Sequence, residues 1–84
     1  MNIAKGSVVI ARAGRDKGRA FVVTDMIDER TALIADGKSR PVEKPKRKNI
    51  IHLRPTAAVL ESVTTNRQLR IFLKDFSKDY SQEG

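Results

Sequence analysis

The side chains of this sequence that are best suited to binding a ligand are basic ones, in two short polar segments. The first segment, residues 14–18, encloses Arg15 and Lys17 between two glycines, and Arg19 follows directly. Glycine tolerates positive φ and lets a ligand approach the backbone, while Arg and Lys offer cationic groups to an anion. The second segment, residues 44–48, carries four basic residues around Pro45. Cations at this density predict binding to the phosphates of a nucleic acid.

We expect the principal contacts to come from these two segments and a second group from residues near them. The principal candidates are Arg15, Lys17, Arg19, Lys44, Lys46, Arg47 and Lys48. The second group is Arg12, Lys38, Arg40, His52 and Arg54. Gly14 and Gly18 join the predicted site, either because they only shape a hairpin or because they also let nucleic acid come close. The simpler alternatives are a solvated loop at residues 44–48 and a packed or surface imidazole at His52.

The net charge agrees with this chemistry. The 84 residues include 17 Lys and Arg against 10 Asp and Glu, which gives a net charge of +7. Residues 1–54 hold 13 of the basic and 6 of the acidic side chains, so the whole excess lies in that part. Such an excess favours a polyanionic partner, whether RNA, DNA or an acidic membrane, and charge alone does not choose among them.

Signatures of several other protein classes are absent. The sequence has no Cys, and a single His without clustered carboxylates argues against a dedicated zinc site. It has no Walker A loop and no Ser/His/Asp arrangement, so we expect no enzymatic activity, no cofactor and no metal. It also has no apolar run of about 18 residues and no signal peptide, which predicts a soluble, cytoplasmic protein without a membrane partner.

Turn signals at close intervals predict short β-strands over the first 54 residues, as in a small barrel or sandwich. The expected strands are residues 7–12 and 19–27, paired as a hairpin, then 31–35, 38–42 and 50–54. The Asp36-Gly37 dipeptide is expected to turn a second hairpin that returns residues 38–42 beside 31–35. Residues 43–49 are expected to form an exposed loop, because Pro45 blocks continuous ladder pairing. The predicted inward pairs are Val8 and Ile10, Phe21 and Val23, Leu33 and Ala35, and Ile51 and Leu53.

After Pro55 the apolar spacing changes to that of an amphipathic helix. Leu69, Phe72, Leu73 and Phe76 fall at i, i+3, i+4 and i+7, with Tyr80 one turn later. A capping box from Thr65 to Gln68 predicts that the helix begins at Asn66. The apolar stripe is expected to pack on the barrel, with a partner-binding face as the alternative. The flanking expectations are a short turn of helix within residues 56–62 and a frayed tail at residues 81–84.

The order of strands, glycines and basic turn resembles the KOW motif of ribosomal proteins and NusG-type transcription factors. The residues that carry the resemblance are Gly6, Val8, Val9, Gly14, Asp16, Lys17, Gly18, Val23, Asp36 and Gly37. With segments 42–49 and 52–55 and the capped helix, the chain resembles small stand-alone bacterial KOW proteins, which are similar to eukaryotic-type large-subunit ribosomal proteins. The resemblance implies a mainly β fold, an SH3-like barrel of about five short strands over residues 1–55. It also implies a C-terminal helical extension, residues 56–84, whose amphipathic α-helix packs on the barrel within one domain.

The same resemblance implies an RNA-binding function. It implies that the protein contacts structured ribosomal RNA through the phosphate backbone, as a ribosomal or ribosome-associated protein in translation. Other ribosomal proteins are then further partners, and the free protein is a monomer. With only three Phe and one Tyr, no stacking platform for bases is expected and recognition of shape is favoured. The alternative function is a protein-interaction module of the transcription-elongation or SH3-like adaptor type.

Overall fold

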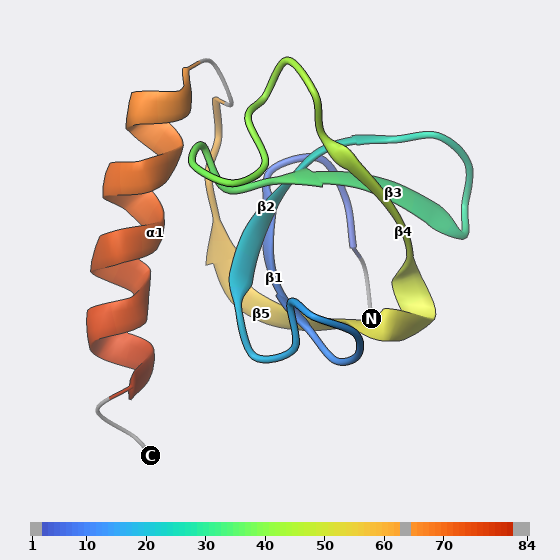
Figure 1. The fold of residues 1–84 in the computed structure, drawn as a ribbon, viewed down its shortest axis with the longest axis horizontal. Coiled ribbons are helices and arrows are strands. Elements are labelled where there is room, and N and C mark those ends of the chain that lie inside the picture. Colours follow the sequence, from blue (N-terminus) through green and yellow to red (C-terminus); the bar gives the residue numbers. More distant parts are fainter. Residues whose placement is uncertain (1–2, 63–64, 82–84) are drawn as a thin grey trace.

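Five short strands form one antiparallel sheet in the computed structural model, which describes residues 3–62 and 65–81. The elements are β1 (Ser7–Ala11), β2 (Ala20–Met26), β3 (Thr31–Ala35), β4 (Lys46–Asn49), a 3₁₀ turn η1 (Ile50–His52), β5 (Leu53–Val59) and α1 (Asn66–Ser81). The strand order is β4-β3-β2-β1-β5, and the sheet curves into a small barrel with α1 beside it (Figure 1). The predicted mainly β barrel with a C-terminal helix is therefore confirmed.

The barrel interior is filled by apolar side chains from β1, β2, β3 and β5. Its members are Val9, Ala11, Phe21, Val23, Ala32, Ile34 and Leu53, each at most 2% exposed. Because side chains alternate along a strand, one set of residues of β1 and β2 faces this interior and the other faces outward. This core holds β1 and β2 in fixed positions, so the turn that joins them is presented on a rigid support.

A second apolar cluster lies between the outer face of the sheet and α1. It comprises Val8, Val22, Ala35, Leu69 and Leu73, with Phe72 and Phe76 packed against it. The predicted apolar stripe of the helix is confirmed, and the stripe is occupied by contact with the barrel. The side chain of Tyr80, placed in the same stripe by the spacing, lies outside the described residues.

The second cluster also explains why several predicted inward pairs are wrong. Both faces of β1 and of residues 21–23 in β2 are buried, so the alternation that separates interior from exterior is lost from these segments. Val8 and Ala35 face the helix rather than the interior of the barrel, where Val9 and Ile34 lie instead. Ile51 is 67% exposed. The remaining misplaced residues are Ile10 and Leu33: Ile10 lines a hollow between the barrel and α1, and Leu33 is half-buried.

The predicted second hairpin is wrong, because residues 38–42 form no strand. Asp36 closes this loop with its own carboxylate, whose Oδ1 accepts hydrogen bonds from the amides of Lys38 and Arg40, both at 2.8 Å. The partner of β3 is β4, with Ile34 opposite Lys46. The second half of the predicted loop at 43–49 is therefore an edge strand, and Pro45 lies just before it. Basic side chains are typical of such an edge, since they discourage pairing with another chain.

The fifth strand also begins and ends later than predicted. Residues 50–52 form η1, and the Asn49 side chain accepts a hydrogen bond from the amide of Ile51 at 3.0 Å. β5 then pairs with β1 over residues 53–59, so the expected helical turn at 56–62 is wrong. Thr56 fixes this strand by donating its hydroxyl to the Val8 carbonyl at 2.7 Å. Residue 55, the predicted end of the barrel segment, lies within β5.

The helix begins at Asn66 as predicted. The hydroxyl of Thr65 accepts a hydrogen bond from the Gln68 amide at 3.1 Å, which is half of the expected capping box. Asn66 ties the first turn of α1 to the loop before β4, since its Oδ1 accepts from the Val42 amide at 2.7 Å and its Nδ2 donates to Glu43 at 3.0 Å. Residues 82–84 of the expected frayed tail lie outside the described residues.

Candidate nucleic-acid interface

The β1–β2 turn presents its basic side chains to solvent. Gly14 and Gly18 adopt φ of +81° and +88°, the region that glycine enters without steric cost. The Gly18 amide donates to the Ala11 carbonyl at 2.8 Å, and this bond helps to close the turn. Arg15 and Lys17 lie on the exposed part of the turn between the two glycines. A Cβ at Gly18 would meet no atom within 4 Å, so the space beside this residue is open.

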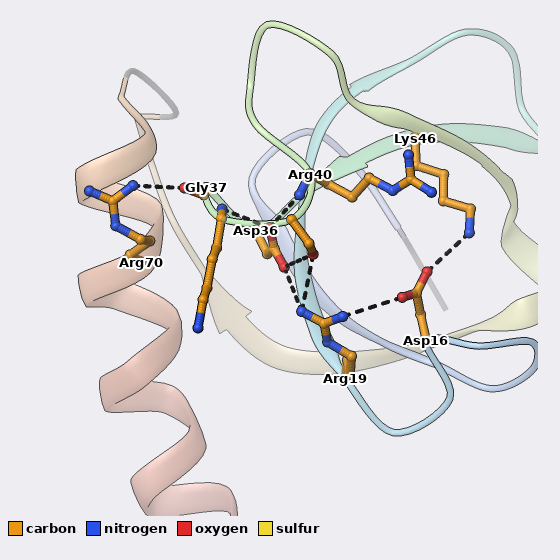
Figure 2. A network of polar contacts seen from close by, with 9 residues as sticks. Asp16, Arg19, Asp36, Gly37, Arg40, Lys46 and Arg70 are labelled. Carbon is orange, nitrogen blue, oxygen red and sulfur yellow. Dashed lines mark hydrogen bonds and ion pairs between the residues drawn. The ribbon is translucent and has the colours of Figure 1, made fainter.

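The fold brings the two predicted basic segments together. Asp16 Oδ2 accepts a hydrogen bond from Lys46 Nζ at 3.0 Å, across 30 positions of sequence (Figure 2). Lys48 reaches the same turn, because its Nζ would lie 3.7 Å from a Cβ placed on Gly14. Lys46 and Lys48 stand opposite the interior residues Ile34 and Ala32 of β3, so both lie on the same face of β4.

Other predicted residues lie on different sides of this turn. Arg47 alternates with its neighbours in β4 and so points to the opposite face of the strand, which separates it from Lys46 and Lys48. Lys44 is exposed in the loop before β4. His52 is exposed in η1, and its carbonyl accepts from the Arg12 amide at 2.8 Å.

A shallow hollow next to the turn collects more of the predicted cations. Arg12, Lys17, Gly18 and Arg54 line it, together with Ile10 and Ala11. Two residues of the predicted second group are therefore placed beside a principal candidate. We call this hollow, the neighbouring turn and the two β4 lysines that reach the turn the basic surface, defined by Arg12, Arg15, Lys17, Gly18, Lys46, Lys48 and Arg54.

Arg19 lies next to this surface, at the centre of an ion-pair network, with its side chain 47% exposed. Its guanidinium donates to Asp36 Oδ2 at 3.0 Å and to Ser39 Oγ at 3.1 Å, and approaches Asp16 Oδ1 at 3.5 Å (Figure 2). It also lies 5.8 Å from the centroid of the Phe21 ring. Arg19 and Lys46 therefore join the β1–β2 turn to the loop and strand that follow β3, a role distinct from that of the solvent-facing Arg15 and Lys17.

Both carboxylates of the network are held in their ionised forms. The hydrogen bond from Lys46 is the main cause that lowers the pKa of Asp16 below its ordinary value, and the charges of Arg19 and Arg40 act in the same direction. Burial by itself would raise the pKa of Asp36. Hydrogen bonds from the backbone of Arg40 and Lys38 outweigh that effect, so the pKa of Asp36 is also lowered.

The predicted site includes Arg19 and Lys46 of this network but not the carboxylates of Asp16 and Asp36 that pair with them. Asp16 was visible as an acidic residue inside a basic turn, a position at which a carboxylate can hold neighbouring cations in place. Arg70 lies outside the predicted site, and its Nη1 donates to the Gly37 carbonyl at 2.8 Å and so connects α1 to the loop (Figure 2). No local pattern signals this contact, because it joins residues 33 positions apart.

Within residues 3–62 and 65–81, no three His, Cys, Asp or Glu side chains gather in a way that could hold a metal ion. The same part of the chain contains no helix long and apolar enough to cross a membrane.

The fold and the basic surface define a small five-stranded β-barrel protein with a packed C-terminal helix and a cationic turn. No family model matches the chain. Its sequence is similar to archaeal proteins named large ribosomal subunit protein eL14. That of Staphylothermus marinus is 38% identical over 56 residues, which cover 67% of this chain and 58% of the relative. That of Pyrobaculum arsenaticum is 41% identical over 56 residues, covering 67% and 54%.

A third relative of the same name, from Metallosphaera sedula, is 36% identical over 59 residues, covering 70% of this chain and 62% of the relative. The chain thus spans a little over half the length of the curated relatives that it matches. The predicted similarity to large-subunit ribosomal proteins is confirmed. The narrower prediction of a bacterial type receives no support, since these relatives are archaeal.

Proposed function

We propose that this protein binds structured ribosomal RNA through the phosphate backbone, as a component or close associate of the large ribosomal subunit. The observation that carries the proposal is the contact between Asp16 and Lys46, because it joins two basic segments into one surface. A rigid β-barrel that presents cations in fixed positions suits the recognition of RNA by shape, where phosphate contacts set position and orientation.

The residues divide by role within this proposal. Arg15 and Lys17, exposed on the turn, contact phosphates directly, and Arg12, Lys48 and Arg54 extend the contact to either side. Arg19 and Lys46 act chiefly by holding the turn in place, since both are paired with carboxylates. Gly14 and Gly18 keep the turn free of side chains that would separate the backbone from RNA. The remaining predicted residues lie outside the basic surface, and we assign them peripheral contacts: Lys44, Arg47, Lys38, Arg40 and His52.

The named relatives support the ribosomal part of this proposal, because each is called a large ribosomal subunit protein. A non-enzymatic role in the cytoplasm, with ribosomal RNA and other ribosomal proteins as partners, follows from it. The bacterial type predicted from the sequence remains a prediction.

The proposal is tested by the salt dependence of RNA binding. Purified protein is titrated against fragments of large-subunit ribosomal RNA, and affinity is measured by fluorescence anisotropy. If about six cations neutralise phosphates, the affinity falls roughly 10³-fold between about 50 and 200 mM salt. Arg15→Glu with Lys17→Glu should reduce the affinity at least about tenfold and flatten the salt dependence.

A matched control carries the same change of charge elsewhere. Arg30 is exposed at the β2–β3 corner and Arg67 on α1, both outside the basic surface. Arg30→Glu with Arg67→Glu should therefore reduce the affinity much less than the turn variant. Equal losses for the two double variants would indicate a diffuse charge effect, and wild-type protein without salt-sensitive binding would refute the proposal.

A further inference from the structure

A groove lies between α1 and the barrel, next to the β1–β2 turn. Its floor is apolar and comes from Ala20, Leu73 and Phe76. Leu73 and Phe76 pack in the second apolar cluster, so their role is to hold the helix on the barrel. The part of the groove that can recognise a ligand is therefore its polar rim.

Among the described residues, four cations line this rim, and they differ in what they contact. Arg19 is held by its ion-pair network, and Arg70 donates to the Gly37 carbonyl at 2.8 Å (Figure 2). Lys38 and Lys74 are exposed, and neither forms an ion pair within the described part of the chain. The arginines thus join parts of the fold, whereas one lysine of the β3–β4 loop and one of α1 are available to an anion.

The carboxylate that lines the groove does not cancel this charge. Asp36 accepts two backbone amides at 2.8 Å and the Ser39 hydroxyl at 2.9 Å, and it pairs with Arg19 at 3.0 Å. Its negative charge is therefore offset inside the loop. Asp75 follows Lys74 in α1 but does not line the groove, since successive helical residues point about 100° apart. The charge that an occupant of the groove meets is positive.

The groove is continuous with the basic surface. Ile10 and Gly18 line both the groove and the hollow that contains Arg12, Lys17 and Arg54. Gly18 has no side chain, and even a Cβ placed on it would meet no atom within 4 Å. A strand of phosphates bound in the hollow can therefore continue over the backbone of Gly18 into the groove.

We propose that the groove binds the sugar-phosphate backbone of the RNA where it continues beyond the hollow, with phosphates near Lys38 and Lys74. The positive rim and its continuity with the basic surface favour this occupant, because phosphate contacts fix the position of a protein on structured RNA. The inference rests on the proposed RNA-binding function and extends it. It makes α1 a part of the RNA interface and places bound phosphates on both sides of Gly18.

The first test measures how many phosphate contacts the groove adds. Wild-type protein and the double variant Lys38→Gln with Lys74→Gln are titrated against the same large-subunit ribosomal RNA fragment at about 50 to 200 mM salt. Each contact contributes roughly 0.7 to 0.9 to the slope of log affinity against log salt. The slope of the double variant should therefore be smaller by about 1.5.

A matched control removes two positive charges from elsewhere. Arg30 and Arg67 are exposed and line neither the groove nor the hollow. Arg30→Gln with Arg67→Gln should therefore keep the wild-type slope. Circular dichroism checks that both double variants are folded. An equal decrease in slope for the two double variants would overturn the groove site in favour of a diffuse charge effect.

Ethylation interference shows where on the RNA the groove binds. Ethylation removes the charge of single phosphates, and the positions at which it blocks binding are mapped for each protein. The groove variant, Lys38→Gln with Lys74→Gln, and a hollow variant, Arg12→Gln with Lys17→Gln, should each lose some positions from the wild-type map. The two lost sets should adjoin on one strand. Lost sets on separate strands would overturn the continuous path across Gly18.

The remaining outcomes separate this inference from the proposed function. An unchanged slope and map in the groove variant, with salt-sensitive binding by the wild-type protein, would overturn the groove site and leave the proposed function intact. Absence of salt-sensitive binding by the wild-type protein would refute both. Loss of large-subunit co-sedimentation in the groove variant without a change in slope would also overturn the inference, in favour of an acidic protein segment as the occupant.

Discussion

The β1–β2 turn and the β3–β4 loop use the same kinds of residue for opposite purposes. Each contains a glycine at positive φ, an Asp with a lowered pKa and several cations. In the turn, Gly18 is open to solvent, whereas in the loop Gly37 lies under α1, where an added Cβ would overlap the Asn66 carbonyl. Residue type alone therefore does not identify a binding surface. The position of the helix decides which segment stays open to a ligand and which one joins parts of the fold.

The largest expected effect comes from adding a methyl group to each glycine. Gly37→Ala forces a left-handed backbone on alanine and pushes it against the backbone of Asn66, so the free energy of unfolding should fall by at least about 2 kcal/mol. Gly18→Ala should lower the free energy of unfolding by only about 1 kcal/mol, the cost of a left-handed backbone for alanine. Urea unfolding followed by circular dichroism measures both values.

Equal losses of stability at the two glycines would contradict the distinction between an open turn and a packed loop. The larger variant Gly18→Val should reduce both stability and RNA affinity, because its side chain projects into the open space next to the hollow that Arg12, Lys17 and Arg54 line.

The sequence predicted the turn better than the loop, and the reason is physical. The turn, β1, β2 and β3 follow from local signals, namely glycines between β-branched runs, and the start of α1 follows from its cap. The prediction for the loop was wrong because the Asp36 side chain accepts hydrogen bonds from the amides of Lys38 and Arg40. These bonds replace the ladder of the expected hairpin. The contact between Asp16 and Lys46 could not be predicted, since it depends on the register of β3 with β4.

A smaller effect is expected from acid, through the same two Asp residues. Folding lowers both pKa values, so the ionised carboxylates favour the folded state. Their contribution to stability is complete above the ordinary Asp pKa, about 3.9, and is lost as the pH falls through the lowered values. The free energy of unfolding should therefore decline below about pH 4.

Comparison of Asp36→Asn with Asp16→Asn shows which carboxylate matters more for this decline. The Asp36 side chain is 9% exposed and accepts hydrogen bonds from two amides, Ser39 and Arg19, so its replacement should remove more of the acid sensitivity. A greater loss of acid sensitivity in Asp16→Asn would mean that the contacts of the turn, rather than those of the loop, contribute more to stability.

The most direct test of the account is the RNA affinity of Asp16→Asn. Removal of a negative charge from an RNA-binding surface ordinarily strengthens binding, and Glu29→Gln, at the exposed β2–β3 corner, serves as the charge-matched control. Because Asp16 holds Lys46 and Arg19 beside the turn, we expect Asp16→Asn to bind large-subunit ribosomal RNA about threefold more weakly than wild type, within the range of one such ion pair. Glu29→Gln should bind as tightly as wild type or slightly more so. Tighter or unchanged binding by Asp16→Asn would contradict the claim that this carboxylate assembles the RNA-binding surface.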